Sequence, residues 1–487
     1  MDDRSDRVLV LVQLKGGNDG LNMVVPLDQY AALSNARSNI LIPENKVLPL
    51  NEATGLHPAM SGLRNLFQEG KMHIVQGVGY PDQNRSHFRS TDIWTSGSAA
   101  GEIISTGWMG RYFDSLAPGY PEGYPNGDFP DPFALTIGNV VSETCQGPIA
   151  NYSLALENPF DLFPLFEGEG SETDSSYYGI QLAFLQNAIV QTNAYAANIT
   201  RIAEKGNNLS TLYPAAGSNP LADQLKTVAL LLSGGIKTRV FIVSLGGFDT
   251  HANQTSSADT ATGEHAVLLG QVSAAITAFM DDVQRLGLSE RVVGMTFSEF
   301  GRRIRSNGGF GTDHGSAAPL LLFGHCTQPG FTGTNPDIPL EPTVQEGVAM
   351  QYDFRSVYGS LLSAWFGLEN TDIKNLLRFD FQQLTLLQAC ALPTGVSDQP
   401  VVLKNWQIHP NPFRDQLTIQ FDSEGKSGFV SLFDALGHEI IRRNIPQQVT
   451  GLQTIVLNTA GLAHSNYYIR IQLGAAQGVQ PVVKASK

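Results

Sequence analysis

Short aliphatic runs, alternating with amphipathic helical patterns, constrain this chain most. Five runs bounded by glycine or polar residues are typical of buried parallel strands: 8–14, 73–77, 240–245, 292–297 and 320–323. Apolar residues recur every three or four positions from Leu268 to Leu286, which predicts a helix that ends at Gly287. A second helix is predicted over 58–67. This order predicts an α/β sheet with helices on both faces.

A step in charge divides the chain. Residues 401–487 carry eight basic and five acidic side chains, a net charge of +3, so the first 400 residues carry −17 within a total of −14. Beside this step lies the polar stretch 392–399, which contains Pro393 and Gly395 and is followed by Pro400. Such a stretch is typical of an exposed linker. We therefore predict a large first domain over 1–390, a linker over 391–405 and a second domain over 406–487.

Composition excludes several classes of protein. The acidic balance argues against nucleic-acid binding, which needs a basic face. The longest apolar run near the start is far shorter than the ~20 residues that span a bilayer, and we expect no transmembrane segment. No GxxxxGK[ST] or GxGxxG loop occurs, so no nucleotide cofactor is expected. Cys145, Cys326 and Cys390 are too few for a disulfide framework and allow at most one bridge.

Carboxylates and histidines in glycine-framed turns follow the predicted strands. Six of them form the candidate set: Asp19, Asp249, His251, Glu299, Asp313 and His314. Because reactive groups gather beyond the carboxyl ends of the strands in such sheets, we expect these side chains to meet. Oxygen and imidazole ligands together predict a divalent metal site, with zinc preferred and manganese, magnesium or calcium as alternatives.

Two interpretations without a metal remain open. Each motif alone could be a turn stabilised by Asn and Asp side chains. The whole set could be a rim held by hydrogen bonds and by ion pairs with Arg302 and Arg303. Of the other histidines, we expect His57 to be structural, whereas His265 and His325 could be further ligands.

A nucleophile would come from residues 82–89, DQNRSHFR, which follow the second predicted strand. Ser86 lies just before the expected start of a helix near residue 90, where a metal can activate a serine. Arg85 or Arg89 could hold an anionic ester oxygen. The alternative is that Ser86 caps the helix and His87 is a packing residue.

Eight ordered motifs resemble a known family. LKGGNDGLN, GLHPAM, RSHFRSTDIW, STGWMGRY, GGFDTHANQ, AFMDDV, SEFGRR and GTDHGSAAP follow the order of the bacterial domain of unknown function 1501 family, over residues 7 to about 385. That family resembles the alkaline phosphatase and sulfatase superfamily. The resemblance implies a three-layer α/β sandwich with a mostly parallel sheet and a metal centre beside a Ser, Thr or modified Cys nucleophile.

The resemblance also implies roles for particular residues. Asp19 corresponds to the metal ligand after the first strand and Ser86 to the nucleophile. The paired ligands correspond to Asp313 with His314 and to Asp249 with His251. Two departures are visible. The superfamily pair is a helical turn apart, whereas here it is Asp-x-His, and no final histidine ligand is evident.

Residues 406–487 form a pattern of short strands and polar turns, which predicts a small β-sandwich. The PNPF opening, LFDALGHEI, LNTAGLAHSNYYIRI and the final Lys484 and Lys487 resemble the type A sorting domain of the type IX secretion system. The resemblance implies outer-membrane passage by that machinery, removal of this domain, and release or surface attachment. The pathway needs an export signal and none precedes Asp2, so we take Met1 to be a mis-assigned start.

Two hypotheses about function follow. In the first, an exported or surface protein hydrolyses a phosphoric or sulfuric ester with a bound metal. In the second, the same fold is catalytically inactive and serves as a surface-exposed structural or binding protein for a metal, a glycan or an anionic polymer. Metal analysis combined with ester hydrolysis separates these hypotheses.

Overall fold

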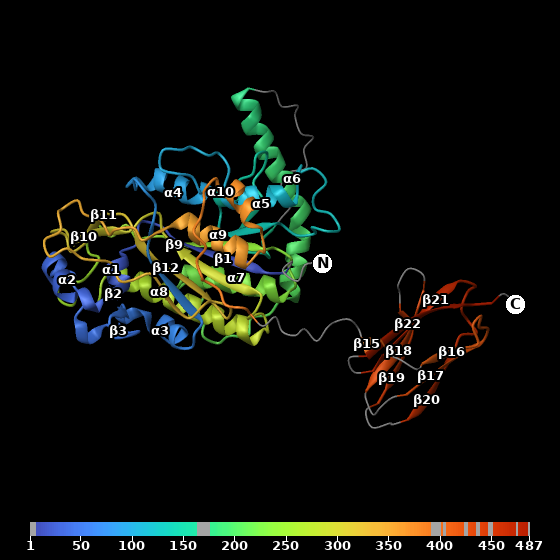
Figure 1. Cartoon of the computed structure of the whole chain (residues 1–487). Coiled ribbons are helices and arrows are strands. Elements are labelled where there is room, and N and C mark those ends of the chain that lie inside the picture. Colours follow the sequence, from blue (N-terminus) through green and yellow to red (C-terminus); the bar gives the residue numbers. More distant parts are fainter. Residues whose placement is uncertain are drawn as a thin grey trace. The chain divides into compact units, whose positions relative to one another are not determined.

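The computed structural model describes residues 6–162, 176–390, 401–402, 406–422, 427–434, 439–446, 451–473 and 476–485. The chain divides into two compact units, Met1–Cys390 and Ala391–Lys487 (Figure 1). Within the linker expected at 391–405, only Val401–Val402 (β15) is described. The rest of that linker and Lys487 lie outside the described residues.

A nine-stranded sheet forms the centre of the first unit. Its spatial order is β13 (Gly330–Thr332), β5 (Met72–Gly79), β12 (Ala318–Gly324), β9 (Val292–Phe297), β1 (Val8–Leu14), β8 (Val240–Leu245), β6 (Ala134–Ile137) and β7 (Ser153–Leu156), with β14 (Tyr352–Asp353) paired to β5. β1 lies parallel between β8 and β9, with Leu9 opposite Val240 and Val293. All five predicted strands are present, and the mostly parallel sheet is confirmed.

The orientation of one strand corrects the prediction. β12 runs antiparallel to both β5 and β9, although residues 320–323 were expected to be parallel. The connection from β9 to β12 contains the antiparallel hairpin of β10 (Arg302–Ser306) and β11 (Thr312–His314) and no helix. Parallel pairing usually needs a crossover helix, so a hairpin connection returns the chain in the opposite direction.

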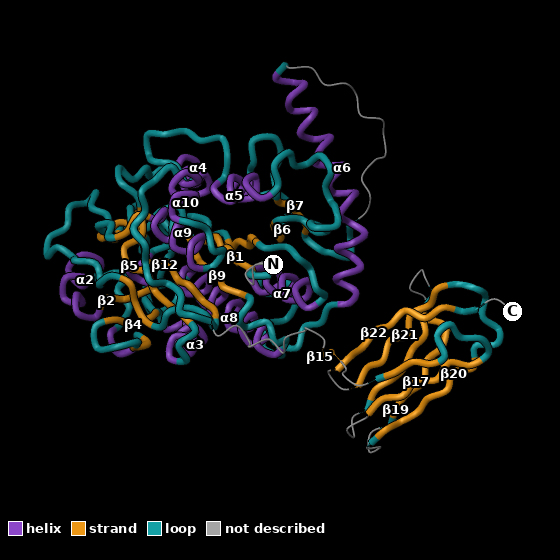
Figure 2. The backbone as a smooth tube through the Cα atoms, turned by 45° about the vertical axis from the view of Figure 1, so that its right-hand side comes forward, coloured by secondary structure: helices purple, strands orange, loops and turns teal. Residues whose placement is uncertain are grey.

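Helices cover both faces of this sheet. α3 (Ser61–Gln68), α7 (Pro220–Ser233) and α8 (Glu264–Arg285) lie on one face, and α4 (His87–Ser96), α5 (Trp108–Leu116), α9 (Phe354–Ala364) and α10 (Asn370–Leu377) lie on the other (Figure 2). Along β1, Val10 and Val12 join one core while Leu9 and Leu11 join the other. Because both faces are buried, every residue of β1 is apolar or shielded. The three-layer α/β sandwich is confirmed.

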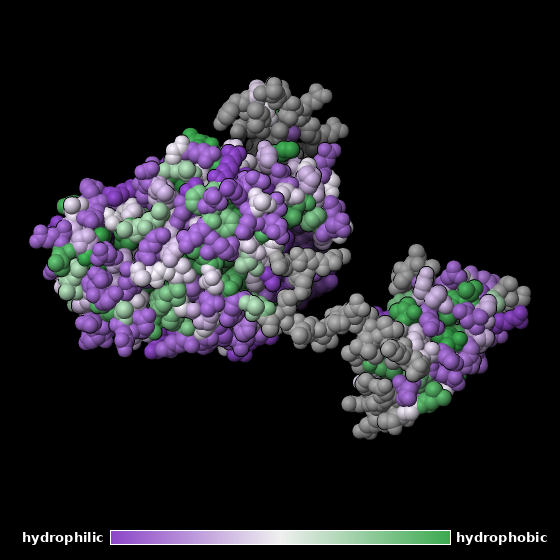
Figure 3. All heavy atoms as spheres, viewed as in Figure 1, coloured by the Kyte–Doolittle hydropathy of each residue, from purple (hydrophilic) through white to green (hydrophobic). Residues whose placement is uncertain are grey.

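Other helices and a small sheet surround this framework. They are α1 (Gly20–Met23), α2 (Tyr30–Arg37), α6 (Tyr177–Lys205) and a small sheet of β2 (Val24–Pro26), β4 (Thr54–Leu56) and β3 (Leu48–Pro49). Short 3-10 turns occur at Leu27–Gln29, Glu44–Lys46, Pro58–Met60 and Glu143–Cys145. Hydrophilic and apolar side chains are interspersed on the face of this unit drawn in Figure 3.

One helix is apolar enough to cross a membrane by length and composition. Among the described residues only α8 meets this criterion, and 56% of its apolar window is buried inside the protein. Its residues Val272, Ile276 and Phe279 belong to the core beneath the sheet. This burial is typical of a core helix.

The second unit is a small β-sandwich, as predicted. One sheet has the order β15, β22 (Ala476–Val483), β21 (Asn466–Leu473), β18 (Gly428–Phe433) and β19 (Glu439–Ile445). The other contains β16 (Gln407–His409), β17 (Gln416–Asp422) and β20 (Leu452–Asn458). Alternate residues such as Leu417, Ile419 and Val430 fill the core between the sheets.

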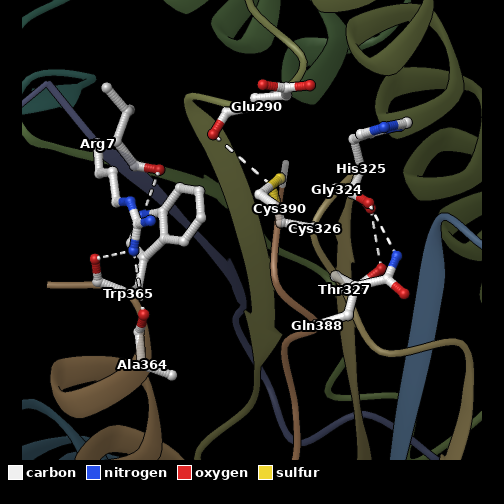
Figure 4. The surroundings of a disulfide bond; sticks show 11 residues. Arg7, Glu290, Gly324, His325, Cys326, Thr327, Ala364, Trp365, Gln388 and Cys390 are labelled. Carbon is white, nitrogen blue, oxygen red and sulfur yellow. Dashed lines mark hydrogen bonds between the residues drawn. A yellow bond between two sulfur atoms is a disulfide. The ribbon is translucent and has the colours of Figure 1, made fainter. Parts of the chain in front are cut away.

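A disulfide bond links the C-terminal residue of the first unit to the segment after β12. Cys326, which follows β12, is bonded to Cys390 (Figure 4). Backbone hydrogen bonds support this clasp, with Gln388 N donating to Cys326 O at 3.0 Å and Gln328 N donating to Leu386 O at 2.8 Å. Cys145 is buried and free. A persistent disulfide fits an oxidising compartment.

We expect removal of this bond to destabilise the first unit. The bond spans 64 residues, and loops of this size lose about 2–5 kcal/mol of unfolding free energy when the bond is removed. Dithiothreitol should therefore lower the melting temperature of the wild type but leave unchanged that of the Cys326→Ala, Cys390→Ala double variant. Equal sensitivity of the two proteins would contradict the prediction.

Candidate metal centre

Four loops meet beyond the carboxyl ends of the central strands. Asp249 and His251 follow β8, and His314 ends β11 of the hairpin after β9. His87 is the first residue of α4, and Glu299 lies two residues beyond the end of β9. The parallel alignment of β1, β8 and β9 places these loops at one edge of the sheet.

Three imidazoles and one carboxylate converge at this edge. His251 Nε2 lies 2.9 Å from His314 Nε2 and 3.1 Å from Asp249 Oδ1. His314 Nε2 also lies 3.1 Å from Asp249 Oδ1, and His87 Nε2 lies 3.4 Å from Asp249 Oδ2. Ligand atoms of His87, Asp249 and His314 all lie within 4.8 Å of one another. We call His87, Asp249, His251 and His314 the ligand cluster.

Hydrogen bonds to the Nδ1 atoms set the tautomers of two imidazoles. His314 Nδ1 lies 2.8 Å from the carbonyl oxygen of Arg85. His87 Nδ1 lies 2.8 Å from Glu299 Oε1. Because both oxygens are acceptors, each Nδ1 must carry the proton. The neutral rings therefore present their Nε2 lone pairs to the cluster.

The third imidazole follows the same rule. His251 Nδ1 lies 3.2 Å from Asp313 Oδ1, so this nitrogen is also a donor. His251 Nε2 and His314 Nε2 then lie 2.9 Å apart, and the Nε2 atom of each of the three imidazoles lies within 3.4 Å of an Asp249 carboxylate oxygen. Such atoms repel one another unless a cation lies among them. An oxygen or carbonyl behind each imidazole is the usual support of a metal-ligating histidine.

One atom of the cluster has no hydrogen bond. His87 Nε2 is buried and lacks a hydrogen-bond partner in the described part of the chain. A buried nitrogen in this state costs free energy, and metal coordination removes that cost. Three imidazoles with one carboxylate also form a donor set suited to zinc and related ions. These residues therefore fit a divalent metal.

Electrostatics keep the ligands in the forms that bind metal. Burial raises the pKa of Asp249, but the Arg302 guanidinium, with His314 and His251, outweighs burial and lowers that pKa from 3.8 to about 2. Burial also lowers the pKa of His314, beyond the opposing effect of its hydrogen bonds. At neutral pH the carboxylate is ionised and this imidazole is neutral, as coordination requires.

Glu299 and Asp313 lie behind the ligand cluster. The Glu299 carboxylate is buried and accepts from Gly16 N at 2.9 Å in addition to His87 Nδ1. Asp313 binds His251 and accepts from Arg303 Nη1 at 3.2 Å. Both residues were expected to be ligands, and in the structure both orient imidazoles.

Asp19 has different contacts. Its carboxylate is fully buried and accepts from Arg37 Nη1 at 2.8 Å and from Gln254 Nε2 at 2.6 Å. It also caps α1 by accepting from Leu21 N. Burial raises the pKa of Asp19, but the nearby Arg37 and His265 charges make the net shift downward. Its contacts are those of an ion pair within the core, and none joins it to the ligand cluster.

The structure separates the three residues expected to act in catalysis. Ser86 is exposed at the N-cap position of α4, and its side chain makes no capping hydrogen bond. The Arg85 guanidinium donates to Gln345 O at 2.9 Å. Arg85 lies next to the ligand cluster, because its own carbonyl oxygen contacts His314 Nδ1. The Arg89 guanidinium donates to the carbonyls of residues 100 and 102. Arg89 therefore holds a neighbouring loop.

Sequence reasoning did not include His87 among the candidate ligands. The helix begins at His87, three residues earlier than expected, so this imidazole lies at the helix start and points to Glu299. Ser90 is instead buried, and its hydroxyl donates to Glu299 O at 2.6 Å. The remaining histidines have other surroundings. His57 caps a turn by accepting from Ala59 N, and His265 Nε2 contacts Asn18 Oδ1.

A cavity of about 580 Å³ opens beside the ligand cluster. His87, Asp249 and Glu299 are among its lining residues, so part of the cluster faces it. Pockets of about 300–1,000 Å³ accommodate small organic ligands. Metal ligands beside such a space could act on a bound molecule.

Two family models match the chain. The model described as a protein of unknown function (DUF1501) matches residues 75–354. The model described as a secretion system C-terminal sorting domain matches residues 407–485. Among curated protein sequences, none matches this chain.

Several solved structures are similar at low sequence identity. A protein in the alkaline phosphatase superfamily from Vibrio parahaemolyticus has 10% identity and a TM-score of 0.33, with 99% of this chain and 83% of that chain covered. A phosphonate monoester hydrolase from Silicibacter pomeroyi has 10% identity and a TM-score of 0.35, with 98% and 88% covered. PorZ, a surface component of the type IX secretion system of Porphyromonas gingivalis, has 18% identity and a TM-score of 0.15, with 18% of this chain and 13% of that chain covered.

Proposed function

The chain belongs to the family of proteins of unknown function DUF1501, and from that premise we propose that its first unit hydrolyses phosphoric or sulfuric esters with a bound divalent metal. The second unit is a type IX secretion sorting domain, and the protein is secreted or attached to the outer-membrane surface. The reaction would then take place outside the cell, on an extracellular ester.

The observation that carries the proposal is the convergence of the ligand cluster beside the cavity. The Nε2 atoms of His87, His251 and His314 lie 3.1 to 3.4 Å from the Asp249 carboxylate oxygens. In our proposal these four residues bind zinc, because that ion prefers four ligands and accepts imidazole and carboxylate groups. When bound, the ion supplies a Lewis acid for the ester oxygens and lowers the pKa of a hydroxyl ligand.

The surrounding residues position the reacting groups. We assign the nucleophile to Ser86, whose exposed hydroxyl directly precedes His87 and has no hydrogen bond within the described chain. Glu299 and the Arg85 carbonyl hold two imidazoles in the required tautomer. The anionic ester oxygens are bound by Arg85 and Arg303. Both guanidiniums donate to adjacent carbonyls, Arg85 to Gln345 O and Arg303 to Val344 O, so they lie near the same segment of the chain.

The test combines metal analysis with ester hydrolysis by the full chain. We expect bound metal after purification, hydrolysis of p-nitrophenyl phosphate or sulfate, loss of turnover with EDTA, and recovery with zinc. Ser86→Ala should lose most of kcat while keeping its metal, with Ser38→Ala as an exposed-helix-end control. Protein without metal or turnover would overturn the proposal, and full kcat in Ser86→Ala would assign the attack to water.

A second function is favoured by one specific observation. The Arg302 guanidinium already donates to Asp249 Oδ1 at 2.6 Å and partly neutralises that carboxylate. This contact weakens the need for a metal and suits a catalytically inactive surface protein that binds a ligand. In that case the purified protein hydrolyses none of the esters, whether zinc is added or not.

A further inference from the structure

Most of the cavity beside the ligand cluster has no part in the hydrolysis proposed above. Its volume of about 580 Å³ leaves room for an organic group larger than the ester itself. A second cavity of about 270 Å³ shares Asp92, Thr95 and Glu143 with it but shares none of the ligand cluster. These three residues therefore line the side of the first cavity that is distant from the cluster.

That distant side carries two carboxylates, those of Asp92 and Glu143, whose charges are not balanced by close ion pairs among the described residues. Asp92 lies on α4 and Glu143 begins the short turn at Glu143–Cys145. Both residues line the first cavity and the second one, so the two carboxylates lie on the same side of the first cavity. Burial and the charge of Asp92 raise the pKa of Glu143. Among the described residues, the one ion pair that either carboxylate forms joins Asp92 Oδ2 to Arg89 Nη1, at the long distance of 4.0 Å.

A buried amide in the floor of the cavity also lacks a partner. Gln13 lies on the central strand β1, is 9% exposed and lines the cavity. No hydrogen bond of its amide occurs among the described residues, although the group can donate two and accept two. The amide therefore offers donors and an acceptor to a polar group bound in the cavity.

The opposite charge occurs near the ligand cluster. Lys15 lies two residues beyond Gln13, is exposed and lines the same cavity beside Asp249. No ion pair of its ammonium group is formed in the part of the chain that the structure describes. Phe88, 87% exposed, also lines the cavity and offers an aromatic face. The cavity thus joins a cationic side near the cluster to an acidic side near Asp92 and Glu143.

We propose that this cavity binds the alcohol part of the ester and selects an alcohol that bears a protonated amine. The amine pairs with Asp92 and Glu143, the Gln13 amide binds a hydroxyl group, and Lys15 faces the anionic ester. This inference rests on the proposed function, because it assigns the leaving group of that reaction. The two carboxylates repel an acidic alcohol, and a neutral alcohol leaves them without a counter-charge. Phe88 can add a cation–π contact to the amine.

The test measures binding of the product alcohols by titration calorimetry of the full chain, which needs no turnover. Glucosamine should bind about tenfold or more tightly than glucose, and glucuronate should bind least. Ethanolamine distinguishes an acyclic amino alcohol from an amino sugar. Glu143→Gln and Asp92→Asn should each reduce the preference for glucosamine over glucose, whereas Glu122→Gln, which removes a charge outside the cavity, should not.

The outcomes are separable from those of the hydrolysis assay. Equal affinities for glucosamine and glucose, or no measurable binding of either, overturn the assignment of the cavity. An unchanged preference in both cavity variants overturns the roles of Asp92 and Glu143. If glucosamine is preferred but no ester is hydrolysed, the proposed enzyme function fails and the amine site stands. Melting temperatures of the Glu143→Gln and Asp92→Asn variants identify any loss of folding. A gain of glucuronate binding when both substitutions are combined would also show that the site is folded.

Discussion

Asp249→Asn should abolish stable metal binding. The substitution keeps the size of the side chain but removes the charged oxygen that lies 3.1 Å from both His251 Nε2 and His314 Nε2. Residues behind metal ligands already contribute about 10–100-fold to affinity, so loss of a ligand charge should weaken binding by more than ~100-fold. Elemental analysis and competition with a chelator measure this change.

Two carboxylates provide the controls for this variant. Asp313→Asn alters the partner of His251 and should weaken binding by about 10–100-fold, less than the loss of a ligand. Asp259→Asn changes an exposed carboxylate of the same loop region, paired with Lys46, and should leave affinity unchanged. Wild-type metal content in Asp249→Asn would show that the cluster is not a metal site. The Asp249→Asn variant should still fold, because Arg302, the partner of Asp249, also donates to the carbonyls of Gly17 and Thr312.

Arg37→Ala should destabilise the first unit by about 3–5 kcal/mol, the usual cost of removing one partner of a buried ion pair. Both side chains of the Arg37–Asp19 pair are fully buried, so the variant leaves an uncompensated carboxylate in the core. The guanidinium also donates to Ile304 O at 2.8 Å, which ties α2 to β10. Urea denaturation followed by tryptophan fluorescence of the full chain measures the change.

An exposed ion pair supplies the matched control. Lys46 and Asp259 are 44% and 37% exposed, and Lys46→Ala should cost no more than about 1 kcal/mol. The pH dependence has a definite sign. Because the pKa of Asp19 is lowered below 3.8 in the folded protein, its contribution is complete above that pH and is lost as the pH falls further. Equal losses in Arg37→Ala and Lys46→Ala would contradict the buried-pair assignment.

Local sequence predicts the strands well but not all of their directions. Runs such as residues 8–14 are apolar except for Gln13 because both faces are buried, and this signal is independent of any partner. Residues 320–323 have the same local pattern, and their antiparallel direction follows from the β10–β11 hairpin before them. Direction is a property of the connection, which the strand's own residues do not encode.

The candidate site illustrates the same limit at the level of single residues. The turns that contain Asp19 and Asp249 look alike in sequence, since each places a carboxylate after glycines. Arg37 folds back onto the first and makes it a core ion pair. His87 becomes a candidate ligand because Glu299, more than two hundred positions later, binds its Nδ1. Such roles depend on pairings between distant segments, which spacing alone does not reveal.

The clasp between Cys326 and Cys390 also determines what proteolysis can leave behind. Cys390 is the last residue of the first unit, and the segment that follows leads to the sorting domain. A protease that cuts between the units creates a new carboxyl terminus. Exopeptidases can then shorten that tail only as far as the covalent crosslink, because Cys390 is joined to the chain beside the central sheet. The first unit thus keeps a defined carboxyl-terminal end under digestion that would shorten a terminus without a crosslink.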